Sequence, residues 1–211
     1  VTIVSATDGL DFDDKLVTDS STGTSTLKFT GAVGGTTMAL NAVQVDVIEL
    51  AHATNVTTAT VVVNTGTTVN LTGGGSIDLD ADDSASNAAA TNTLLVNVSN
   101  AWTDITTLGG VQTLLISATP DAAADTDTDA NGTAETDITL GSLTLNAATT
   151  TVVVQGSEDL VINTLTNNAS SVLSASAMTG NLTIGATAAT GTYVLGNGTN
   201  SIAASFASTV H

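Results

Sequence analysis

Residues 151–202 of the chain read TVVVQGSEDL VINTLTNNAS SVLSASAMTG NLTIGATAAT GTYVLGNGTN SI. This stretch repeats one pattern, in which a few aliphatic-rich residues are followed by a polar hinge. The aliphatic units fall at 151–154, 159–162, 171–173, 181–184, 192–195 and 201–202. They recur about every eight to twelve residues, the spacing of short strands joined by turns. The pattern predicts a stack of strands in which each strand is covered by its neighbours, as in repeat proteins.

The hinges between these units are rich in Gly and Asn. They lie at 155–157, 167–168, 179–180, 185–186 and 196–198. Gly and Asn are frequent at sharp corners because such corners often require a positive φ, which other side chains resist. We therefore expect turns with positive φ between the strands.

The composition favours a thin, regular core and excludes several functions. Hydrophobic residues make up 42% of the chain but aromatic residues only 2%, and the net charge is −18. Such a charge excludes nucleic acid as a partner and makes the metal-free chain repel itself at low salt. Hydrated cations, calcium above all, are the natural counter-ligands. The chain has no Cys, and no apolar run long enough to cross a membrane, so membrane insertion is not expected.

The rest of the chain carries a looser version of the same rhythm. Further strands are expected within 26–29, 43–50, 61–63, 69–71, 77–79, 93–98 and 113–117. A helical turn is expected over 102–108. Trp102, the one Trp of the chain, caps the stack or plugs a gap between strands; a sugar-binding platform is the alternative.

The strongest metal signal lies at 121–137, an acidic segment that follows Pro120. The alternating oxygen donors and the Gly of this segment match the first nine positions of an EF-hand-type loop, although Ile138 stands where that loop has its bidentate Glu. The expected Ca²⁺ ligands are Asp127, Asp129, Asn131, Thr133 and Glu135, with Asp137 as a further candidate. An acidic insertion without metal is the alternative.

Two other acidic groups form a second tier of candidate calcium ligands. Asp11 and Asp13 lie in an acidic turn, for which a solvated turn is the alternative. Asp78, Asp80 and Asp82 are two residues apart and would line one side of a strand, where three like charges repel unless a cation neutralises them. The alternative for this group is an acidic edge that discourages strand addition.

Two pieces of the terminal stretch resemble known secreted repeat proteins. Residues 171–184 resemble the unit of bacterial surface-layer and related β-strand-repeat proteins, in which a strand, a Ser-Ala turn and Thr-Gly precede a Leu-Thr strand. Residues 196–202, GNGTNSI, are similar to the Gly-rich nonapeptide of RTX proteins, with Asn200 where that family has its calcium-binding Asp. The resemblance implies a right-handed parallel β-helix or related β-solenoid, type I secretion through a signal outside this segment, and calcium-dependent assembly on the cell surface.

The sequence thus predicts an all-β chain, either a parallel β-solenoid or a two-sheet β-sandwich. We expect one continuous domain of a larger protein, with β-repeat regions at 1–120 and 138–211 around the acidic loop 121–137. The expected function is a structural module of a secreted, self-assembling surface-layer protein, whose anchor to cell-surface glycan or lipopolysaccharide lies in another region. The alternative is a repeat stalk of an adhesin. No enzyme is expected, because the chain lacks a Lys-bearing phosphate loop, a nucleophile elbow and paired histidines.

Overall fold

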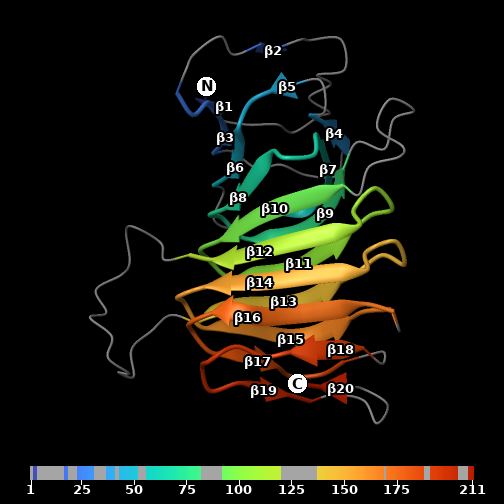
Figure 1. Ribbon diagram of the computed structural model, residues 1–211. Coiled ribbons are helices and arrows are strands. Elements are labelled where there is room, and N and C mark those ends of the chain that lie inside the picture. The colour runs from blue at the N-terminus through green and yellow to red at the C-terminus, as the bar shows by residue number, and fades with distance from the viewer. Residues whose placement is uncertain are drawn as a thin grey trace.

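The structure, a computed structural model, describes residues 2–3, 17–18, 23–30, 37–40, 43–51, 56–81, 92–119, 137–168, 170–187, 191–203 and 209–211. These residues form strands and turns, with no helix among them. As the chain advances it alternates between two large sheets (Figure 1). In each sheet the strands follow one another from the N-terminal to the C-terminal end, and one turn of the chain through both sheets is a rung. A small sheet of β2 (Val17–Thr18) and β5 (Val43–Gln44) accompanies the first turns.

The first large sheet has ten strands and the second has eight. In spatial order the ten-stranded sheet contains β1 (Thr2–Ile3), β3 (Thr26–Phe29), β6 (Val47–Leu50), β8 (Thr68–Leu71), β10 (Thr93–Val98), β12 (Thr113–Ala118), β14 (Thr151–Gly156), β16 (Val172–Met178), β18 (Thr192–Val194) and β20 (Thr209–Val210). The eight-stranded sheet contains β19 (Ser201–Ile202), β17 (Leu182–Ile184), β15 (Leu160–Thr166), β13 (Ile138–Thr144), β11 (Trp102–Thr107), β9 (Gly75–Ala81), β7 (Val56–Val63) and β4 (Thr37–Ala39).

Every strand pair in both sheets is parallel, which confirms the predicted β-solenoid and rules out an antiparallel β-sandwich. From β3 to β19, each rung of the solenoid contributes one strand to each large sheet. Polar contacts between neighbouring rungs join residues 20 to 22 apart at several places, such as Asn92 with Gln112 and Asn181 with Asp159. The separation rises to 38 residues between Ser117 and Gln155, because the acidic segment is inserted there.

The core lies between the two sheets and is built from alternate residues of the strands. In β10, Leu94, Val96 and Val98 are buried while the residues between them are partly exposed. Because the strands pair in register, each buried side chain stacks on its counterpart in the next rung, as Leu94 does on Leu114 and Leu114 on Val152. One continuous hydrophobic core results, from Leu27 to Tyr193. The predicted thin, aliphatic core is confirmed.

A shared irregularity in the eight-stranded sheet corrects one prediction. Residues Trp102 and Ile105, both buried, are three apart in β11 rather than two, because two consecutive residues between them face outward. The same spacing recurs in β13 and β15, where Leu140 with Leu143 and Ile162 with Leu165 continue the two buried columns. The helical turn expected over 102–108 is therefore wrong: residues 102–107 form a strand, and its spacing of three repeats in register from rung to rung.

The hinge glycines follow the expectation only in part. Among the described glycines, only Gly66, Gly75 and Gly156 have a positive φ, so the expectation is confirmed in the hinge 155–157. At Gly180 and Gly196 the reason for glycine is space, since a Cβ would lie 2.4 Å from a backbone oxygen of the preceding rung. Stacked rungs approach closely at the corners, and a side chain there would push them apart.

The two neighbouring leucines of β12 provide a test of this core. Leu114 is fully buried, whereas Leu115 points outward and is partly exposed. We expect Leu114→Ala to lower the free energy of unfolding by about 2–4 kcal/mol, because it leaves a cavity, and Leu115→Ala to lower it by about 1 kcal/mol or less. Denaturant unfolding followed by Trp102 fluorescence measures both. Equal losses for the two variants would contradict the assigned inward and outward faces.

Candidate functional site

The acidic insertion leaves the solenoid at one corner, and both of its flanks are fixed. The backbone N–H of Thr119 donates to the carbonyl of Val98 at 3.0 Å, and that of Ile138 donates to the carbonyl of Asp159 at 3.0 Å. Residues 120–136 lie outside the described part, and with them the predicted ligands Asp127, Asp129, Asn131, Thr133 and Glu135. The predicted second-tier ligands Asp11, Asp13 and Asp82 lie outside it too.

Asp137, the last residue of the predicted loop, is described and exposed. It directly precedes β13, and the pairing of Ile138 with Leu160 places it beside Asp159 of the next rung. The base of the insertion therefore carries carboxylates on two successive rungs.

Asp159 begins a chain of side-chain to backbone contacts that we call the Asp–Asn corner, made of Asp159, Asn181 and Asn200. The carboxylate of Asp159 accepts hydrogen bonds from the backbone N–H and the side-chain amide of Asn181, at 2.6 and 2.7 Å. The Asn181 amide oxygen accepts from the N–H of Thr199 at 2.6 Å. One polar side chain per rung thus holds the next turn in place.

Asn200 completes this corner. Its amide oxygen accepts from the N–H of Leu182 at 3.0 Å, and its amide nitrogen donates to the carbonyls of Gly196 and Gly198 at 3.0 and 2.8 Å. The side chain that stands at the calcium-ligand position of the similar nonapeptide is therefore bonded to its own turn and to the neighbouring rung. Sequence reasoning missed the structural role of this corner, because the contacts join residues about 20 apart.

Asp78 and Asp80 lie on the outer side of the eight-stranded sheet, as the spacing of two predicted. The register places Asp78 between Thr60 and Thr106, so that hydroxyl side chains rather than acids flank it. Asp80 accepts hydrogen bonds from the N–H groups of Ala81 and Gly110 at 3.0 and 2.9 Å. Asp80 thus fixes the turn that follows β11.

A third acid on this face, Asp104, was not among the predicted ligands. Its carboxylate accepts hydrogen bonds from the hydroxyl of Thr106 at 3.2 Å and from that of Ser142 on the next rung. Ser76 and Ser142 flank Asp104 in register. Asp78 and Asp104 therefore have Ser and Thr as their cross-strand neighbours, which reduces mutual repulsion and satisfies part of their hydrogen-bonding capacity.

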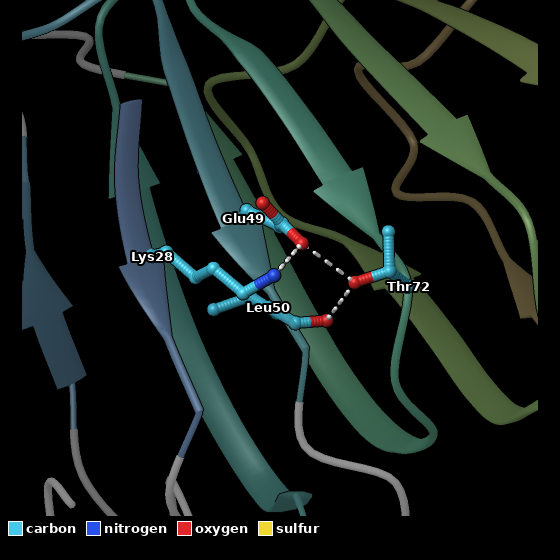
Figure 2. A network of polar contacts seen from close by, with 4 residues as sticks. All are labelled: Lys28, Glu49, Leu50 and Thr72. Atoms are coloured by element: carbon cyan, nitrogen blue, oxygen red, sulfur yellow. Dashed lines mark hydrogen bonds and ion pairs between the residues drawn. The ribbon is translucent and has the colours of Figure 1, made fainter. Parts of the chain in front are cut away.

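The ten-stranded sheet carries an ion pair near the N-terminal end. The ammonium of Lys28 contacts Glu49 Oε1 at 2.7 Å, and the hydroxyl of Thr72 donates to the same oxygen at 3.2 Å. The three side chains come from successive rungs, and the Thr72 hydroxyl also reaches the carbonyl of Leu50 (Figure 2). The Lys28 side chain is 39% exposed, so solvent screens the pair and its contribution to stability is small.

Buried hydroxyls hold the opposite corner of the solenoid. Thr107 and Thr149, both almost fully buried, hydrogen-bond to each other at 2.9 Å, and the Thr149 hydroxyl contacts the carbonyl of Val111 at 2.7 Å. The amide of Asn168 donates to the carbonyl of Thr149 at 2.9 Å. Both corners are thus built from polar side chains that bridge rungs.

No three His, Asp or Glu side chains of the described ranges lie close enough together to hold a metal ion. The same ranges contain no helix long and apolar enough to span a membrane. Comparison of the chain with family models, curated proteins and solved structures finds no match.

Neighbouring acids in the β14–β15 turn test the Asp–Asn corner. Asp159→Ala removes the acceptor of two hydrogen bonds from Asn181, so we expect it to lower the free energy of unfolding by about 1–2 kcal/mol. Glu158→Ala is the control, because it removes the same charge and one long contact from Ser157 at 3.3 Å. Urea denaturation of both variants measures the difference. A Glu158→Ala loss as large as that of Asp159→Ala would show that charge, not the corner contacts, determines stability.

Proposed function

We propose that this chain is a structural module of a secreted surface-layer protein, which calcium stabilises and which assembles with copies of itself into a lattice on the cell. The observation that supports this most is the unbroken stack of rungs around one aliphatic core. Such a stack offers outer surfaces that repeat from rung to rung. A repeat scaffold that contacts its neighbours through long regular faces suits assembly better than chemistry.

The calcium part of the proposal comes from charge and from the position of the insertion. A chain of net charge −18 resists close approach of a second copy unless cations neutralise it. The insertion 120–136 is held at both ends by the solenoid, with Asp137 at its base beside Asp159. Carboxylate and amide oxygens at alternate positions are the donors that Ca²⁺ prefers. We assign the ion to Asp127, Asp129, Asn131, Thr133 and Glu135, with Asp137.

Calcium binding at the insertion would be coupled to self-assembly of the chain. Each calcium ion neutralises two negative charges and fixes an acidic loop. A ligand that binds the assembled form more tightly than the free chain stabilises the assembled form. Within the proposal, Asp78 and Asp80 are secondary positions, because donors of the protein already contact Asp80.

The adhesin stalk remains the second candidate. Rungs stack in one direction, so the chain holds its two ends apart, as a spacer does (Figure 1). A stalk needs no contact with copies of itself. A measurement of self-association therefore distinguishes the surface-layer module from the adhesin stalk.

A calcium titration of the purified chain tests the proposal. We expect calcium, but not magnesium at equal concentration, to increase light scattering through ordered assembly and to increase β-content in circular dichroism, and EGTA to reverse both changes. Mg²⁺ is the control because it keeps its own water and prefers few protein ligands. A chain that is fully folded, monomeric and indifferent to calcium would contradict the surface-layer proposal and favour the stalk.

A pair of substitutions locates the ion. Asp127→Asn with Asp129→Asn should abolish the tightest calcium binding and weaken calcium-dependent assembly at least tenfold, an estimate of about 1.4 kcal/mol or more per site. Asp19→Asn with Asp121→Asn is the matched control, because it removes the same charge outside the motif. Isothermal titration calorimetry measures binding. Unchanged affinity in the first pair would show that the motif does not hold the ion.

A further inference from the structure

The outward side chains of β8, β10, β12, β14, β16 and β18 form a surface that we call the neutral face. None of these strands contains a charged residue. In the eight-stranded sheet, by contrast, β9 and β11 carry Asp78, Asp80 and Asp104. The strands β13, β15, β17 and β19 of that sheet also lack charged residues, so the contrast lies in the rungs of β8 to β11. In a chain of net charge −18, the neutral face is the side of those rungs where a second copy meets less repulsion.

The register arranges the neutral face in three columns. The first is mostly threonine: Thr93, Thr113, Thr151, Val172 and Thr192. The second is mostly aliphatic: Leu95, Leu115, Val153, Ser174 and Val194. The third carries amides and a hydroxyl: Asn70, Asn97, Ser117 and Gln155.

The aliphatic column has no counterpart of the same length on the other sheet. There the residues in register along the outer side of β13, β15, β17 and β19 include Thr139, Val161, Thr183 and Ser201, with one aliphatic side chain among them. On the neutral face, Val172 adds an apolar side chain to the threonine column beside the aliphatic column, and is 38% exposed, the most exposed large apolar side chain within the described sheet strands other than Val210 of the end rung.

Covering the polar column with a second protein surface costs little free energy. The side-chain amide of Asn97 donates to Asn70 Oδ1 at 2.8 Å, and that of Gln155 donates to Ser117 Oγ at 2.9 Å. These groups hydrogen-bond to each other along the column, so that part of their hydrogen-bonding capacity survives loss of water. An aliphatic column beside polar groups that are partly satisfied within the sheet suits a surface that packs against protein.

The size of the face suits a weak, repeated contact. Six strands about 4.8 Å apart and three outward columns about 17 Å wide cover roughly 500 Å². Two such faces would bury roughly 1,000 Å² together, at the lower limit for a specific interface. A lattice multiplies a contact of this strength over many copies.

We propose that the neutral face packs against the neutral face of a second copy of this chain, sheet on sheet. The contact is self-complementary, because the aliphatic columns of two copies related by a twofold axis lie opposite each other. This inference rests on the self-assembly proposed above and names its surface. Calcium acts elsewhere, at the acidic insertion, so the contact itself needs no metal once salt screens the net charge.

Single lysine substitutions test the surface. Val153→Lys places an ammonium in the middle of the aliphatic column, whereas Val161→Lys makes the same change on the outer side of β15. Both variants lower the net negative charge by one, so overall repulsion decreases equally. Analytical ultracentrifugation in EGTA and high salt, at about 10 µM to 1 mM protein, measures association in the range expected for a weak contact.

We expect wild type and Val161→Lys to associate equally and Val153→Lys at least about tenfold more weakly, with unchanged thermal unfolding. Leu115→Lys, on the neighbouring rung, should weaken association to a similar extent. Agreement of the two variants would exclude misfolding of one of them as the cause. If all variants assemble like wild type in calcium, the neutral face is not the contact while the proposed function stands. If wild type stays monomeric in calcium and in high salt, both proposals fail. A monomer that binds a polysaccharide through Val153 would assign the face to glycan and overturn the inference.

Discussion

Parallel hydrogen bonding between successive rungs is the constraint on which the rest of this structure depends. It places residues of neighbouring rungs side by side, so every column of the solenoid must tolerate its own neighbours about 4.8 Å away. Inward columns satisfy this with Leu, Ile and Val, from Leu94 through Leu114 to Val152. Many outward columns satisfy it with Thr, Ser and Asn, which can hydrogen-bond to a copy of themselves, and the middle column of the neutral face satisfies it with Leu and Val.

Like charges on neighbouring rungs are the arrangement that such stacking tolerates least. Like charges directly opposite each other on a sheet are destabilising, and the described strands avoid this arrangement. Asp78 lies between threonines and Asp104 between serines, while the one acid of the ten-stranded sheet, within the described strands, faces Lys28. Most other acids of the chain, including those of 121–137, are not in the described strands. The described strands thus carry few acids, and none of these acids lies directly opposite another.

Much of the fold could be predicted from the sequence, because alternation and hinge spacing act locally. The strands of 151–202 and the outward position of Asp78 and Asp80 followed from a period of two. The parallel direction did not follow from spacing, since short strands at that interval suit a sandwich as well. The helical turn expected over 102–108 was wrong, because residues 102–107 form a strand that pairs in register with the strands of both neighbouring rungs.

The candidate site was less accessible to sequence reasoning. Calcium motifs are local and can be recognised, but the Asp–Asn corner joins Asp159 to Asn181 across a full rung. Gly180 looked like a residue chosen for its φ, yet its role is to let two rungs approach. Contacts of this kind depend on the register, which a single sequence does not specify.

Our central proposal is that this acidic solenoid assembles when calcium neutralises its charge. Electron microscopy of the wild-type chain, exchanged from EGTA into calcium, tests this most directly. We expect extended, regular two-dimensional arrays in calcium and dispersed particles in EGTA. Dispersed single particles under both conditions, from protein that is folded, would contradict it.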